Sequence, residues 1–105
     1  MKPIASLIIA ASLSAFAVAP VVADDVDHAQ AMDLVEKGTI KDPRELNEAA
    51  LELHPGAKIV DTELENEYGK YVYKLELRDS ANVEWDVAID AASGAVLENR
   101  QDDDD

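Results

Sequence analysis

The chain has 105 residues, with 9 Lys and Arg against 23 Asp and Glu, so its formal charge at neutral pH is −14. Nucleic acids and anionic membrane surfaces are bound through basic patches, and this acidity argues against both as partners. It would suit a partner with a basic surface, or simply solubility. The chain contains no cysteine, which excludes disulfides and a lipidated N-terminal cysteine.

The N-terminal segment has the composition of a secretory signal peptide. Lys2 supplies a basic start, residues 4–19 are uncharged and apolar, and Val21-Val22-Ala23 offers the small residues that a signal peptidase reads. We therefore expect cleavage after Ala23, a periplasmic or secreted protein, and no stable membrane insertion after the cut. The alternative is an uncleaved anchor, because residues 4–22 approach the ~20 residues that span a bilayer.

The next segment, residues 24–101, is expected to form a single domain that begins with two helices. Asp24 or Asp25 can cap a first short helix that runs to about Lys37, and Gly38 stands where a left-handed helix end is favoured.

The second helix is better specified. Asp42 is the expected N-cap, Pro43 the first helical residue, and Glu45 completes a capping-box pattern. The apolar face consists of Leu46, Ala49, Ala50 and Leu53. Pro55 cannot continue the helix, and Gly56 lets the chain reverse.

Four strands follow, because large apolar residues recur at every second position. The first, Lys58–Glu65, is expected to place Val60, Thr62 and Leu64 on one face and its acidic residues on the other. The inward residues of the next two strands are Tyr71, Tyr73, Leu75 and Leu77, then Val83, Trp85, Val87 and Ile89.

Three turns connect these strands. They are predicted at 66–69, at 79–82 and at 90–94, where Asp90 can accept hydrogen bonds from backbone amides and Gly94 can supply a positive φ. A short last strand is expected at 95–98, and the four aspartates of 102–105 are expected to form a disordered acidic tail. The predicted fold class is α+β, with the second of two N-terminal helices packed on a curved four-stranded antiparallel meander.

Together these segments resemble a PepSY domain over roughly residues 27–98. The similarity lies in the step Pro55-Gly56-Ala57-Lys58-Ile59-Val60, the strand beginning Gly69-Lys70-Tyr71-Val72-Tyr73, and the ending Asp90-Ala91-Ala92-Ser93-Gly94-Ala95-Val96-Leu97. The block 31–38 is similar to stand-alone secreted members. Asn82 stands where a glycine is common, but asparagine tolerates the same left-handed conformation. The resemblance implies an exported, non-catalytic module with a proposed role in restraining peptidases.

No residue set predicts an enzyme, and no cofactor is expected. Thr62, Ser80 and Ser93 are expected on strands or turns, and His28 and His54 in separate helices without ligand-like spacing. Asp24, Asp25, Asp27 and the acidic tail offer oxygen atoms that suit a hard cation, but neither segment matches an EF-hand. We therefore predict no dedicated metal site.

The residues singled out are mostly structural. Asp42, Gly56, Tyr73, Trp85, Asp90 and Gly94 are expected to shape caps, turns and the core, and Tyr68, in a hairpin turn, is the candidate for partner contact.

Two functions remain open. The first is an exported binding module that inhibits or regulates a peptidase, with an open sheet edge able to accept a partner strand. The second is an envelope sensory accessory that binds the extracytoplasmic domain of a sensor kinase, or divalent cations. Self-association is also open, because so small a core leaves a thin stability margin.

Overall fold

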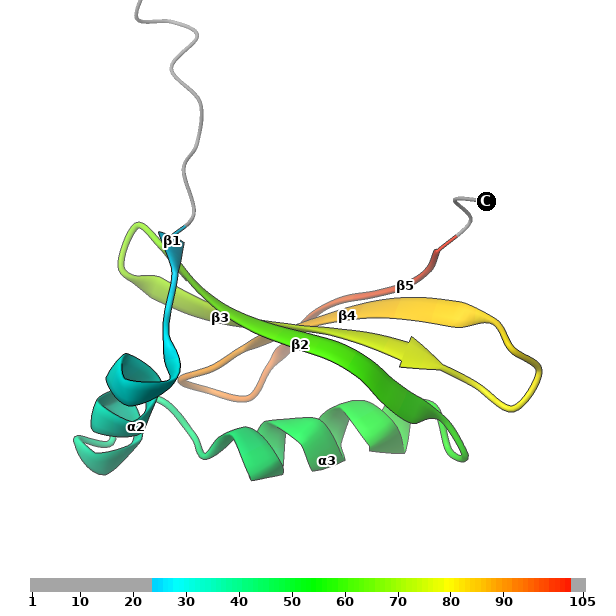
Figure 1. The fold of residues 1–105 in the computed structure, drawn as a ribbon, viewed down its shortest axis with the longest axis horizontal. Coiled ribbons are helices and arrows are strands. Elements are labelled where there is room, and N and C mark those ends of the chain that lie inside the picture. The colour runs from blue at the N-terminus through cyan, green and yellow to red at the C-terminus, as the bar shows by residue number, and fades with distance from the viewer. Residues whose placement is uncertain (1–23, 103–105) are drawn as a thin grey trace, which may run out of the picture.

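The computed structural model describes residues 24–102. In this part of the chain two helices, α2 (His28–Glu36) and α3 (Pro43–Leu53), lie below a five-stranded antiparallel sheet (Figure 1). The strands, in spatial order, are β1 (Asp24–Asp25), β2 (Lys58–Glu67), β3 (Lys70–Arg78), β4 (Glu84–Asp90) and β5 (Val96–Gln101). The α+β class is confirmed. The prediction of four strands was wrong, because β1 adds a fifth strand at one edge.

The extra strand also changes the start of the first helix. Asp24 pairs with Asn66 and Asp25 with Glu65, so both residues are extended. The cap of α2 is Asp27, whose carboxylate accepts a hydrogen bond of 2.8 Å from the backbone N–H of Gln30. The expected cap at Asp24 or Asp25 was therefore wrong: all three aspartates can cap a helix, and the sheet edge takes the first two.

Helix α3 begins and ends at the expected residues. The Asp42 carboxylate accepts from the backbone N–H of Arg44 at 2.9 Å, Pro43 opens the helix, and the chain reverses through Gly56 at φ +87°. The helix lies across β2, β3 and β4. Its apolar face is narrower than predicted, because Leu46 and Ala50 are buried whereas Leu53 remains 36% exposed.

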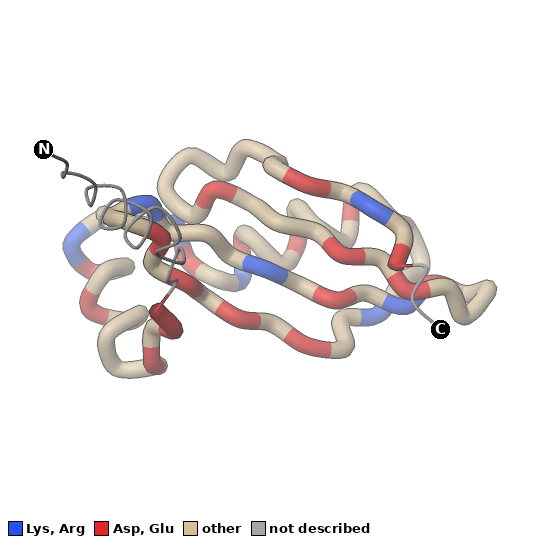
Figure 2. The backbone as a smooth tube through the Cα atoms, turned by 90° about the horizontal axis from the view of Figure 1, so that it is seen from above, with Lys and Arg blue, Asp and Glu red and all other residues tan. Residues whose placement is uncertain are grey.

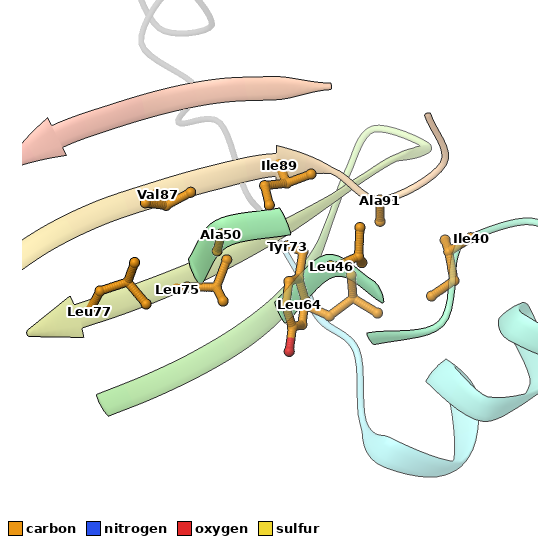
Figure 3. Close-up of a cluster of buried hydrophobic side chains, with 10 residues drawn as sticks. All are labelled: Ile40, Leu46, Ala50, Leu64, Tyr73, Leu75, Leu77, Val87, Ile89 and Ala91. Carbon is orange, nitrogen blue, oxygen red and sulfur yellow. The ribbon is translucent and has the colours of Figure 1, made fainter. Parts of the chain in front are cut away.

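The core fills the space between α3 and the sheet (Figure 3). Residues from α3 and the three central strands form most of it, joined by one residue before the helix and one after β4: Ile40, Leu46, Ala50, Leu64, Tyr73, Leu75, Leu77, Val87, Ile89 and Ala91. Tyr73 satisfies its hydroxyl by donating to the Asn47 Oδ1 of α3 at 2.8 Å.

The first hairpin is tighter than predicted. Only Tyr68 and Gly69 lie between β2 and β3, with φ of +57° and +87°. A two-residue loop with both φ positive follows the right-handed twist of the strands, so β2 continues to Glu67 instead of ending at residue 65. The last strand is also longer than expected: β5 runs from Val96 to Gln101, whereas the prediction was 95–98.

An irregularity in β2 overturns one face assignment. The pairing with β3 shifts between Ile59 and Asp61, so Val60 is the extra residue of a bulge and is 50% exposed. Ile59 packs on the core in its place. A bulge reverses the alternation of side chains before it, which period-two counting cannot anticipate.

The described residues cover the predicted domain but, apart from Asp102, not the two segments predicted to flank it. The predicted signal peptide, residues 1–23, and the tail residues 103–105 lie outside the described residues. Asp102 does not behave as part of a free tail, because its N–H donates to the Glu84 carbonyl at 2.9 Å. No helix within residues 24–102 is long and apolar enough to cross a membrane.

Candidate functional site: an acidic sheet face

The face of the sheet turned away from α3 is the most distinctive surface of the described chain. Successive strand residues point to opposite faces, so those that alternate with the core residues point outward here. Figure 2 looks down on this face and shows Asp and Glu on all of the long strands. We call it the acidic face and define it by Asp61, Glu63, Glu65, Glu67, Glu76, Glu84, Asp86 and Glu98.

The sheet register aligns these side chains in rows across the strands. One row runs from Asp61 through Glu76 and Asp86 to Arg100. The next runs from Glu63 through Lys74 and Ala88 to Glu98. These two rows line a shallow hollow in the middle of the face. In the first row Asp61, Glu76 and Asp86 stand directly opposite one another. Repulsion among their carboxylates opposes pairing of the strands.

Three basic residues of this face, Lys74, Arg78 and Arg100, are engaged in ion pairs. Lys74 Nζ lies 2.9 Å from Glu65 Oε1 and 3.5 Å from Glu67 Oε2. The hydrogen bond to Glu65 holds the pKa of Lys74 above its ordinary value. The guanidinium of Arg100 lies 3.0 Å from Glu98 and 3.7 Å from Asp86, and that of Arg78 pairs with Glu84. Acidic side chains still outnumber these cations, so the face keeps a net negative charge.

Burial and crowding of carboxylates raise pKa values on this face. Oxygen atoms of Glu76, Asp86 and Asp102 lie within 4.8 Å of one another. Burial raises the pKa of Glu76, and the negative charges of Glu84 and Asp86 raise it further. Burial and the charge of Asp102 likewise raise the pKa of Asp86. A raised pKa means that the ionised form is disfavoured, and a nearby cation would relieve that cost.

A second carboxylate cluster lies where β1 joins the sheet. Oxygen atoms of Asp25, Glu63 and Glu65 also lie within 4.8 Å of one another. A hydrogen bond with Asp25 raises the pKa of Glu63. Each cluster could offer oxygen ligands to a hard cation. The sequence predicted such ligands only among neighbouring aspartates, at 24–27 and at 102–105, whereas one cluster joins Asp25 to two acids of β2 and the other joins Asp102 to acids of β3 and β4.

Two small side chains on the acidic face are buried, which the sequence did not predict. Val72 is 4% exposed and Ala88 is 6% exposed, although both point away from α3. Ala88 is opposite Lys74 and Glu98, whose long side chains can cover it. Their neighbours on the same face of each strand, two positions away, are charged, so the sequence shows no apolar alternation that would predict their burial.

The residues expected to be structural lie in caps, turns and the core. Trp85 is half-buried, donates its indole N–H to Asp79 at 3.0 Å, and packs against the His54 ring at a centroid distance of 4.3 Å. The Asp90 carboxylate accepts from the N–H groups of Ala92 and Ser93, at 2.9 and 3.2 Å, and Gly94 has φ +85°.

The two histidines lie far apart in the sequence and in different environments. His54 Nε2 lies 2.7 Å from the side-chain oxygen of Asn99 on β5. His28 lines a groove between α2, the start of α3 and β2. Tyr68, at the tip of the first hairpin, is 75% exposed.

The described chain is therefore a module of one helix-covered sheet with an exposed acidic face. The profile of the PepSY family, described as the peptidase propeptide and YPEB domain, matches residues 45–100. The match spans more than half of the chain, from the first turn of α3 to β5, and this protein belongs to the PepSY family. No curated protein and no solved structure shows a significant match to the chain. PepSY domains are peptidase-propeptide and inhibitor-like modules that often interact with peptidases.

Proposed function

We propose that this protein is an exported, non-catalytic binding module that regulates or inhibits a peptidase, and that residues 24–101 are its single domain. Membership of the PepSY family supports the class of partner. The acidic face is the observation that supports a recognition surface, because one side of the sheet carries the core and, among the described residues, no helix or strand covers the other (Figure 1). Its charge would attract a basic patch around the partner's cleft and accelerate encounter at low salt.

Tyr68 is a second element of this proposal. A bulky aromatic side chain at positive φ is an unfavourable choice for a two-residue turn, where asparagine or glycine fits better. Its side chain is largely exposed and has little to pack against. Tyrosine is common among residues that anchor protein interfaces, so we assign Tyr68 a contact role beside the acidic face.

The test is capture of partners from cell-envelope extract with the tagged protein, cross-linked and read by mass spectrometry at low and high salt. A peptidase as the dominant catch, weakened by salt, is expected. The double variant Glu76→Lys/Asp86→Lys should lose the catch. Glu48→Lys/Glu52→Lys makes the same charge change on α3 and should keep it. Equal capture by both variants would remove the acidic face from the proposal.

An envelope sensory accessory is the second candidate, favoured by the two carboxylate clusters. Here the partner would be the extracytoplasmic domain of a sensor kinase, with a divalent cation as the signal. A sensor kinase in the same capture experiment, with a yield that depends on added Ca²⁺, would support this candidate against the peptidase.

A further inference from the structure

The outer edge of β2 is largely open in the described part of the chain. Strand β1 pairs only with Glu65 and Asn66, and the N–H of Val26 then donates to the Leu64 carbonyl at 2.9 Å. At Asp27 the chain turns into α2. Between residues 24 and 102 no strand lies beside Lys58–Glu63 on that side, and Figure 1 shows β2 running on below the end of β1.

The direction of the backbone groups at this edge follows from one hydrogen bond. The Leu64 carbonyl points toward β1, because it accepts from Val26. In an antiparallel strand the backbone groups of alternate residues point to the same edge. The N–H and C=O of Thr62 therefore also point outward, and Thr62 is exposed. An incoming strand could continue the line of β1 and pair with these groups.

The two sides of this edge differ in chemistry. On the helix side lies the groove that His28 lines; Val26, Ala31, Pro43, Leu64 and Tyr73 supply its apolar lining, and Asp25, Thr62 and Glu63 add polar lining where it meets the strand edge. On the other side stand Asp61 and Glu63, with Asp25 next to Glu63. Side chains of an added strand alternate between the two sides. One set would enter this groove, where apolar side chains from α2, α3 and the core line it, and the other would face carboxylates.

We propose that the free edge of β2 binds an extended segment of the partner protein in which apolar residues alternate with Lys or Arg. This rests on the proposed function, and it names the edge and the sequence pattern that the partner presents. Charge decides against a second copy of this chain as the occupant, because pairing two β2 edges would bring Asp61 and Glu63 of each copy against those of the other.

Proline at Thr62 tests the backbone pairing. Because the N–H of Thr62 points away from β3, Thr62→Pro removes a donor from the free edge and leaves the ladder between β2 and β3 intact. Gln101→Pro is the matched control on the opposite edge. The N–H of Asp102 donates to β4, so that of the preceding residue points outward. Near-wild-type circular dichroism and Trp85 fluorescence would show that both variants fold.

The probes are three synthetic six-residue peptides: alternating Lys-Val, a block of three Lys followed by three Val, and alternating Glu-Val. We expect the Lys-Val peptide to bind and to shift the amide signals of Thr62, Glu63 and Leu64 in spectra of ¹⁵N-labelled protein. Thr62→Pro should weaken that binding roughly tenfold or more, and Gln101→Pro should not. Equal binding of the block peptide, or shifts only at the acidic face, would overturn the proposal.

A charge variant keeps the proposal testable if Thr62→Pro fails to fold. Glu63→Lys should weaken binding of the Lys-Val peptide and improve binding of the Glu-Val peptide, whereas Glu48→Lys should do neither.

The experiments distinguish failure of the edge proposal from failure of the proposed function. If folded Thr62→Pro still captures the peptidase and binds the Lys-Val peptide normally, the edge proposal falls and the peptidase proposal stands. If the peptide results hold but no peptidase is captured, the edge proposal stands without its assigned partner class.

Discussion

The indole Nε1 of Trp85 donates a hydrogen bond to Asp79 Oδ2 across 3.0 Å, which ties the start of β4 to the turn that precedes it. The other carboxylate oxygen of Asp79 accepts from the N–H groups of Ala81 and Val83, both at 2.9 Å. One carboxylate thus organises the β3–β4 turn and fixes the orientation of the tryptophan.

Removing that carboxylate should loosen the turn. We expect Asp79→Ala to lower Tm by several degrees, because two backbone donors and the indole lose their acceptor. The hydrogen bond from Trp85 holds the pKa of Asp79 below its ordinary value, so this contribution is present above the unfolded-state pKa and is lost as pH falls through the folded-state pKa. Thermal melts between pH 7 and pH 2, with Ser80→Ala as the control in the same turn, measure both effects. A variant as stable as wild type would show that the three bonds add nothing.

The acidic face should respond to pH in the opposite direction. Glu76 and Asp86 have pKa values raised in the folded protein, so between the unfolded and folded values the native state binds more protons. Their contribution to stability therefore falls as pH rises through that window. We expect Glu76→Gln to raise Tm more at pH 7 than at pH 4. Glu48→Gln on α3 is the control, and an equal gain from it at pH 7 would assign the effect to net charge alone.

The core between α3 and the sheet should be sensitive to truncation at one leucine of the helix and tolerant of truncation at another. Leu46 is 1% exposed and Leu53 is 36% exposed, on the same helix. Leu46→Ala should cost about 2–5 kcal/mol of unfolding free energy through lost burial and a cavity. Leu53→Ala should cost much less. Urea unfolding followed by Trp85 fluorescence measures both, and similar losses would mean that the helix packs on a different face.

The turn before β5 should require glycine. Gly94 has φ +85°, and a Cβ built there would lie 3.1 Å from Lys41 Cε. We expect Gly94→Val to destabilise the domain by about 1–3 kcal/mol, because a β-branched residue is strained at this φ. Ala92→Val in the same turn is the control. Equal melting points for the two variants would contradict the turn geometry.

The tip of the first hairpin allows stability and binding to be separated. Tyr68→Asn places Asn before Gly69 and should raise Tm, since asparagine adopts positive φ more readily than tyrosine. The same variant should weaken partner capture if Tyr68 is a contact residue. Tyr68→Thr should lower Tm, because a β-branched residue is strained at positive φ, and should weaken capture, because it lacks the aromatic ring. Unchanged capture by a folded Tyr68→Asn protein would remove Tyr68 from the interface.

Local sequence patterns determined the ends of α3 and the buried side of the central strands. Asp42 and Pro43 begin α3, the Pro55-Gly56 step ends it, and alternation from Tyr73 to Ile89 defines the buried side of two strands. These features depend on residues close in sequence, so short-range rules of capping, turn chemistry and period-two burial suffice. The family resemblance rested on the same segments.

Only the tertiary structure decided the features that depend on pairing between distant segments. Asp24 and Asp25 form a strand because β2 offers an edge, and Val60 leaves the core face because the register slips at a bulge. The carboxylate clusters arise the same way, since the register brings Glu76 opposite Asp86 and folds Asp102 against them. Composition predicted an acidic protein, but strand pairing placed that charge on one face and left residues 58–63 of the β2 edge without a neighbouring strand among the described residues, because the β2 bulge and the pairing of β1 depend on contacts between segments distant in sequence.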